Sequence, residues 1–124
     1  MLGPVVQTEL AQLHQLASVF VLSSAYEGLP LVALEALACG TPVVTTKCGE
    51  TPKLLPADCG VICGERTPEA IADALRKVLL HPENYPVESC VRAAQPYSAR
   101  SVIGEIYSNM LHCWEKRIFS SAPA

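Results

Sequence analysis

The chain has 124 residues, which is enough for one domain and too few for two. Half of its residues are hydrophobic and only 17% are charged, which excludes intrinsic disorder because such a chain can bury a core. The net charge of −3, with no cluster of lysine and arginine, argues against a protein that binds nucleic acid.

No segment has the pattern of a transmembrane helix or a signal peptide. The longest apolar stretch, residues 29–39, is too short to cross a bilayer and contains Glu35. The first residues lack the basic and apolar regions of a secretory leader. We therefore expect a cytoplasmic protein that reaches a membrane surface only through a partner.

The six cysteines do not indicate a disulfide framework or a metal site. Cys59 and Cys63 bracket three residues, but neither a second pair nor a histidine at ligand spacing follows them. We expect reduced, mostly buried thiols and no bound metal. The three histidines, His14, His81 and His112, have no obvious catalytic partner and are expected at packing or surface positions.

Short β-branched runs alternate with helical patterns along the first half of the chain. Residues 5–6 are a candidate strand stub, and Thr8 can cap a helix that runs to about residue 17. Residues 19–22 form an apolar run typical of a strand buried on both faces. The first helix is expected to face inward with Leu10, Leu13, Leu16 and Ala17.

The middle of the chain repeats this alternation. Pro30 opens a helix that Gly40 closes, a strand follows at residues 42–46, and a short helix is expected at 52–55. Residues 61–62 form a third short strand.

The last part of the chain is predicted to be helical. Thr67 caps a helix that ends at residue 80, with Ile71, Leu75, Val78 and Leu79 directed inward. A weaker helix is expected within residues 83–94, Ser98 caps a final helix to about residue 117, and residues 118–124 form a tail. The alternation predicts an α/β fold, a parallel sheet of three to four strands flanked by helices, in one domain over residues 1–124.

Glu35 stands alone among apolar residues in its predicted helix. A helix that is apolar all round is buried, and a buried carboxylate without a partner costs several kcal/mol (roughly 2–7 for a polar group). None of its neighbours three or four residues away can pair with it. Glu35 must therefore bond another element, bind a ligand, or open onto a cleft.

Glu27 lies in the loop at the carboxyl end of the strand at residues 19–22, the end of an open α/β sheet where ligands bind. The helix start that follows presents free N–H groups suited to an anion, and Gly28 allows close backbone approach. Glu27 and Glu35 are too far apart to act as a pair on one bond, but they can bind two ends of an extended ligand. A carboxylate accepts two hydrogen bonds, which suits a vicinal diol, so the arrangement outlines a sugar nucleotide. Ser23 and Ser24 are candidates to line the same site.

The segment 26–44, with Glu27 and Glu35 separated by seven residues, resembles the E-x7-E motif of retaining glycosyltransferases of the GT-B fold, the large family-4 type. The segments Tyr-Glu-Gly-Leu-Pro and Ala-Cys-Gly-Thr-Pro-Val-Val are close to the usual sequence of that family. The resemblance covers residues 3–114 and corresponds to the later half of the donor-binding domain. It implies a truncated Rossmann-like parallel sheet.

The resemblance also implies roles for individual residues. Glu27 would contact the donor sugar as the catalytic residue, and Glu35 would bond the ribose hydroxyls. The remaining donor-binding positions it implies are Val5 at the nucleobase and the backbone of Gly28, Leu29 and Leu31 at the sugar and diphosphate. The family's diphosphate-binding arginine and lysine are absent, and Lys47 is either a partial substitute for them or a solvated loop lysine. The donor would be a UDP- or GDP-sugar, for polysaccharide biosynthesis, without a tightly bound cofactor or metal.

The resemblance leaves out the acceptor domain and the first strands of the donor domain. Glu50 and Lys53 replace a glycine and a glutamate of the family pattern, and the added carboxylate at residue 50 would repel a diphosphate. We therefore expect transfer only with an acceptor domain, from a longer parent chain or a partner chain. The alternatives are a non-catalytic nucleotide-binding module, or a structural remnant that self-associates through an uncovered sheet edge.

Overall fold

The computed structural model describes the backbone of residues 3–120 and the side chains of residues 3–118. The chain divides into two compact units, one up to residue 94 and one from residue 95 on, and each is described by itself. The first unit contains a parallel sheet in the order β1 (Phe20–Leu22), β2 (Val43–Thr46) and β3 (Gly60–Cys63). Val21 is paired with Val44, and Val44 with Val61. The predicted α/β fold with a short parallel sheet is confirmed.

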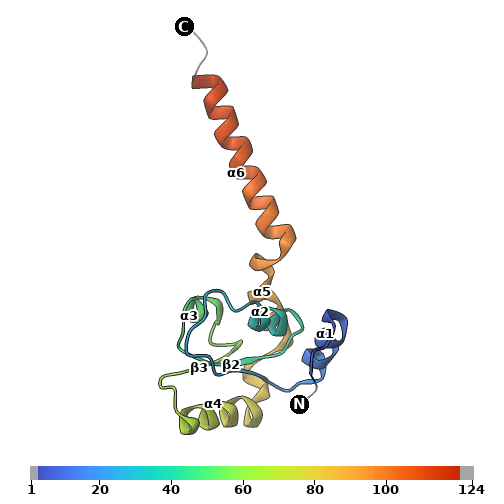
Figure 1. Cartoon of the computed structure of the whole chain (residues 1–124), viewed down its shortest axis with the longest axis vertical. Coiled ribbons are helices and arrows are strands. Elements are labelled where there is room, and N and C mark those ends of the chain that lie inside the picture. The colour runs from blue at the N-terminus through green and yellow to red at the C-terminus, as the bar shows by residue number, and fades with distance from the viewer. Residues whose placement is uncertain (1–2, 121–124) are drawn as a thin grey trace. The chain divides into compact units, whose positions relative to one another are not determined.

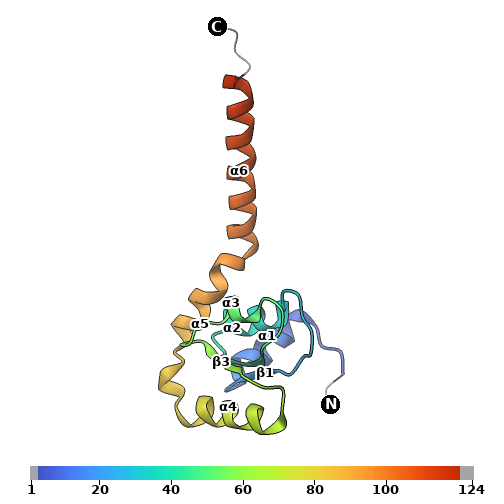
Figure 2. The same ribbon diagram turned by 90° about the vertical axis from the view of Figure 1, so that its left-hand side faces the viewer.

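Helices cover both faces of this sheet (Figures 1 and 2). On one face lie α2 (Leu31–Ala38) and α5 (Val87–Ala94), and on the other lies α4 (Pro68–Leu80). The side chains of β2 are buried in both directions, because successive residues of a strand point to opposite faces. The first core cluster comprises Ala33, Ala36, Leu37, Val43, Leu55, Cys59, Cys90 and Ala94, and the second comprises Val44, Cys63, Ala74 and Val78.

The N-terminal prediction was wrong in two respects. Val5 and Val6 form no strand, because no other strand of the described chain lies beside them to exchange backbone hydrogen bonds. Val6 instead has extended backbone and precedes α1 (Gln7–Leu16), which begins without a side-chain cap. Thr8 therefore lies inside the helix and does not cap it.

The expected apolar face of α1 was also wrong. Leu16 is 84% exposed and Leu13 is also exposed, whereas His14 is buried. The His14 ring meets the Phe20 ring edge to face, with centroids 5.3 Å apart. The histidine thus takes the packing position that we had assigned to leucine, as its aromatic ring allows.

Strand β1 is less buried than its apolar sequence indicated. Val21 is 39% exposed and lies at a hollow with Ile71 and Leu75 of α4. The reason is topological: β1 is an edge strand, so α4, which packs on β2 and β3, covers it incompletely. An apolar run alone cannot distinguish an edge strand from a central one.

The remaining elements follow the predicted order. The helix α3 spans Thr51–Leu54, and the segment expected as one weak helix is a 3₁₀ turn, η1 (Pro82–Asn84), followed by α5. Gly40, with φ of +84°, ends α2 as expected. In α4, Leu79 is 51% exposed and Ala74 is buried, so the buried stripe of this helix lies on Ala74 and Val78.

The second unit consists of the 3₁₀ turn η2 (Gln95–Tyr97) and the long helix α6 (Ala99–Ser120). Ser98 caps α6 as predicted, because its hydroxyl accepts a hydrogen bond from the N–H of Ser101 at 3.2 Å. The helix extends beyond the expected end at residue 117. The predicted tail therefore does not begin at residue 118, and residues 121–124 lie outside the described residues.

The two predicted threonine caps provide a matched test of helix capping. The hydroxyl of Thr67 accepts a hydrogen bond from the N–H of Ala70 at 3.2 Å, at the start of α4. Thr67→Ala is expected to lower the free energy of unfolding by about 1 kcal/mol, because it leaves a first-turn donor without its partner. Thr8→Ala should change it by less than about 0.5 kcal/mol, as surface substitutions do. Chemical denaturation of both variants checks this, and equal losses would contradict the assignment of the cap.

Candidate functional site

The loop after β1 holds the carboxylate of Glu27 by a short hydrogen bond. The Ser24 hydroxyl donates to Glu27 Oε1 at 2.6 Å. The loop is anchored to the sheet by Thr46, the last residue of β2, whose hydroxyl donates to the Ser24 carbonyl oxygen at 2.6 Å. Glu27 is half-buried, so its carboxylate is both held and accessible.

The loop after β2 packs directly against the backbone of the first loop. Gly49 has φ of +50°, and a Cβ atom built on it would stand 1.8 Å from the carbonyl oxygen of Glu27. The N–H of Glu50 donates to the carbonyl oxygen of Gly28 at 3.3 Å. The carboxyl ends of β1 and β2 therefore carry two loops in close contact, at the edge of the sheet where ligands bind.

The start of α2 follows the first loop. Pro30 precedes the helix with extended backbone, and its carbonyl accepts from the N–H groups of Ala33 at 3.0 Å and Leu34 at 3.3 Å. The first N–H groups of a helix have no intrahelical partner and carry the positive end of its dipole. Leu29 and Leu31 are 45% and 64% exposed, and Gly28 is also exposed. The residues that lead into this helix start are therefore exposed.

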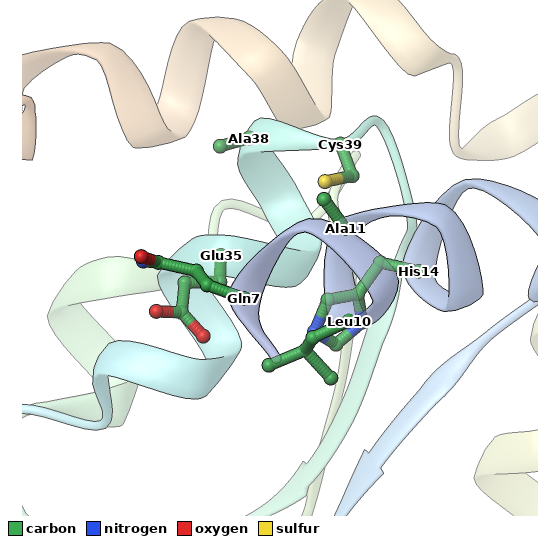
Figure 3. A pocket seen from close by; sticks show the side chains of 7 residues that line it. All are labelled: Gln7, Leu10, Ala11, His14, Glu35, Ala38 and Cys39. Carbon is green, nitrogen blue, oxygen red and sulfur yellow. The ribbon is translucent and has the colours of Figure 1, made fainter. Parts of the chain in front are cut away.

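Glu35 lies one turn further along α2, at a pocket between α1 and α2. The cavity has a volume of about 170 Å³ and is lined by Gln7, Leu10, Ala11, His14, Glu35, Ala38 and Cys39 (Figure 3). Figure 3 shows the Glu35 side chain on α2 and the Gln7 and Leu10 side chains on α1 at this pocket. Within the described part of the chain, the Glu35 carboxylate has no hydrogen bond or ion pair. The sequence left three alternatives for Glu35, and in the structure its side chain lies at a cleft.

The sequence analysis did not identify the α1 side of this pocket. Gln7 and His14 are seven residues apart on one helix, which places them on the same face. The Nε2 atom of His14 is buried and has no hydrogen-bond partner in the described structure. The backbone of His14 is fixed by Thr41, whose hydroxyl donates to the His14 carbonyl oxygen at 2.5 Å. The seven-residue spacing was the available signal, but nothing in it indicated that α1 would pack beside Glu35.

The two departures from the family pattern after β2 pair with each other. Lys53 Nζ lies 2.7 Å from Glu50 Oε2, and both side chains are exposed. An exposed ion pair contributes little stability, about 0–1 kcal/mol, but it offsets the charge of the added carboxylate. The repulsion that we expected from Glu50 toward a diphosphate is therefore reduced.

Val5 and Lys47 lie outside the residues that line the pocket beside Glu35. Val5 is 38% exposed in the segment before α1, and Lys47 is exposed directly after β2. Glu27 is also absent from that lining and belongs to the pair of contacting loops. The structure thus brings Glu27 and Gly28 together with Gly49 and Glu50, and it places Glu35 on a neighbouring pocket.

Three of the buried cysteines, Cys59, Cys63 and Cys90, have raised pKa values. Burial raises the pKa of Cys59 to about 12, with the nearby Cys90 and Asp58 adding to the effect. Burial also raises the pKa values of Cys63 and Cys90. A buried thiol with a raised pKa stays protonated at neutral pH and is a poor nucleophile. Among residues 3–118, no cluster of three or more histidine, cysteine or acidic side chains is arranged to hold a metal ion.

Among the described residues, no helix is both long enough and apolar enough to span a bilayer.

Comparison with known proteins identifies one family. The sequence profile of the family described as glycosyl transferases group 1 matches residues 1–95. The GDP-mannose-dependent alpha-(1-6)-phosphatidylinositol dimannoside mannosyltransferase of Mycobacterium tuberculosis is 35% identical over 82 residues, which is 66% of this chain and 21% of that protein. The D-inositol 3-phosphate glycosyltransferase of Streptomyces coelicolor is 32% identical over 123 residues, which is 94% of this chain and 27% of that protein.

A solved structure supports the same conclusion. The sucrose-phosphate synthase of Thermosynechococcus elongatus superposes with a TM-score of 0.76 and 27% identity, over 90% of this chain and 30% of that protein. The chain thus spans 21–30% of the length of these three proteins. The family match covers the whole sheet and the helices that pack on it, and the similar fold agrees with this match. The chain therefore belongs to the group 1 glycosyl transferases and has the α/β architecture of their GT-B fold.

Proposed function

We propose that this chain is the later half of the donor-binding domain of a family-4-type retaining glycosyltransferase, and that it binds a UDP- or GDP-sugar. The observation that carries the proposal is Glu35, a half-buried carboxylate that opens onto a pocket without a partner in the described residues. Its two oxygens can accept from the two hydroxyls of a ribose. One relative has a name that specifies GDP-mannose as its donor, which supports a sugar nucleotide here.

The two contacting loops would receive the rest of the donor. The diphosphate would lie at the start of α2, where the N–H groups and dipole favour an anion, with Gly28, Leu29 and Leu31 exposed beside it. Glu27 would accept a hydrogen bond from the sugar. Val5 would approach the nucleobase, and Lys47 would add a positive charge near the diphosphate.

Transfer would require parts that the chain does not contain. The chain spans at most 30% of the proteins compared above, and the proposal assigns it to the donor side alone. An acceptor domain, from a longer chain or a partner, would complete the enzyme. Without such a domain, the chain would be a nucleotide-binding module that keeps the ribose contact of Glu35 at its pocket.

Glu27 and Glu35 divide the ligand between them in this proposal, and that division can be measured. In Glu27→Ala, the affinity for a free nucleoside diphosphate is expected to stay the same. The additional affinity that the sugar gives to the sugar conjugate is expected to fall about tenfold. The reason is the loss of one charge-assisted hydrogen bond, worth about 1.5–3 kcal/mol. Isothermal titration with GDP and GDP-mannose, and with UDP and UDP-glucose, checks this. Equal losses for the diphosphate and the sugar conjugate would refute the division.

A further inference from the structure

We propose that Ser24 and Thr46 are positioning residues that hold the carboxylate of Glu27 in the single rotamer in which it meets the donor sugar. This inference rests on the proposed function of Glu27. It assigns a task to two hydroxyl groups that are not themselves part of the proposed donor contacts.

The first step is the contact between Ser24 and Glu27. The serine hydroxyl donates its one proton to Oε1 of Glu27 at 2.6 Å, a short bond of the charge-assisted kind. This bond occupies one carboxylate oxygen and leaves Oε2 available to accept from a sugar hydroxyl. A glutamate has several rotatable bonds, so a bond that fixes it before the ligand arrives removes an ordering cost from binding.

The second step ties Ser24 to the sheet. The hydroxyl of Thr46 donates to the Ser24 carbonyl oxygen at 2.6 Å. Thr46 is 2% exposed and is the last residue of β2, the central strand, whose residues are all buried. A loop anchored to a central strand is held more rigidly than a loop anchored to another loop.

The third step fixes the backbone of Glu27 itself. Its carbonyl oxygen lies against Gly49, where no side chain fits, and the next carbonyl, that of Gly28, accepts from the N–H of Glu50 at 3.3 Å. Glu27 is therefore constrained through its backbone by one loop and through its side chain by Ser24. Ser18 is an exposed serine before β1, at the opposite end of that strand from Glu27, and has no such bond in the described structure, which makes it a matched control.

The test compares Ser24→Ala and Thr46→Val with the controls Ser18→Ala and Thr46→Ser. Two quantities are measured on the whole chain. The first, without ligand, is the set of three-bond NMR couplings that report the χ1 rotamer of Glu27. The second is the ratio of dissociation constants for GDP and GDP-mannose, and for UDP and UDP-glucose, which isolates the contribution of the sugar. Thermal denaturation of every variant identifies any that fail to fold.

We expect a single Glu27 rotamer in the wild-type protein and in both controls, and averaged couplings in Ser24→Ala. The sugar contribution should fall about threefold to tenfold in Ser24→Ala, while the affinity for the diphosphate stays the same. If Ser24 acts through Glu27, the double variant Ser24→Ala/Glu27→Ala should lose no more of the sugar contribution than Glu27→Ala alone. If Thr46→Val does not fold, Ser24→Ala decides the matter.

The outcomes separate this inference from the proposed function. A fixed Glu27 rotamer in Ser24→Ala overturns the inference, as does additive loss in the double variant, while binding by the wild-type protein would leave the proposed function intact. If the wild-type protein binds none of the four nucleotides, the proposed function fails. The couplings then still decide whether Ser24 holds Glu27.

Discussion

Gly49→Ala is expected to lower the free energy of unfolding by about 3 kcal/mol, at the upper end of the usual range for a single substitution. The corresponding fall in Tm for a unit of this size is about 12–24 °C. A Cβ at this position would stand 1.8 Å from the carbonyl oxygen of Glu27 and 2.9 Å from that of Gly28. Both obstacles are backbone atoms, so the two loops must separate rather than adjust a side chain.

The same substitution should weaken sugar nucleotide binding, because it displaces the loop that carries Glu27. The control is Gly64→Ala, where an added Cβ meets nothing within 4 Å. That variant is expected to be unchanged or more stable by up to about 1 kcal/mol, because alanine can adopt this conformation and restricts the unfolded chain. Chemical and thermal denaturation measure both variants. A Gly49→Ala protein as stable as Gly64→Ala would show that the loops do not meet as described.

Glu35→Ala is expected to weaken nucleoside diphosphate binding about 100-fold. Two hydrogen bonds from ribose hydroxyls to one carboxylate account for this, each at the lower end of the range of about 1.5–3 kcal/mol for bonds to a charged group. The free energy of unfolding should stay the same or rise slightly. In the folded protein the half-buried carboxylate has no partner among the described residues, so its removal costs no native contact of that kind.

Glu88→Ala serves as the control for Glu35→Ala, because Glu88 is an exposed residue in the first turn of α5 and lies outside the pocket. Titration calorimetry with GDP and UDP measures the affinity, and chemical denaturation measures the stability. Unchanged affinity in Glu35→Ala would contradict the assignment of Glu35 to the ribose hydroxyls. A large loss of stability would show instead that Glu35 has a structural role.

The sequence predicted the central part of the fold well because local signals agreed there. Thr67 and Pro68 specify the start of α4, and the cap is present as expected. The β-branched run at residues 43–46 became a strand with every side chain buried. These features depend on neighbours in the chain, and neighbours can be read from the sequence.

The errors arose where a distant neighbour decides the outcome. Val21 is exposed because β1 lies at the sheet edge, and no local pattern encodes strand order. Val5 and Val6 have the apolar character of a strand, but no strand among residues 3–120 lies beside them. His14 is buried because Phe20 offers its ring a contact, which only the folded chain brings about.

The candidate site shows the same limit. The sequence located Glu27 and Glu35 and the open helix start between them. The bond from Ser24 to Glu27 and the anchor from Thr46 depend on how two loops meet, and the lining of the Glu35 pocket depends on how α1 packs. The pairing of Glu50 with Lys53 was within reach, because residues three apart on a helical turn are neighbours.

The most direct test of whether this chain binds a sugar nucleotide is its thermal stability with millimolar GDP, UDP, GDP-mannose and UDP-glucose. A ligand that binds only the folded state adds RT ln(1 + [L]/Kd), which is about 2.7 kcal/mol at 100 times Kd. We predict a rise in Tm with the nucleotides of one base, larger for the sugar conjugate and absent in Glu35→Ala. No shift with any of the four in a folded protein, or an equal shift in Glu35→Ala, would contradict the account.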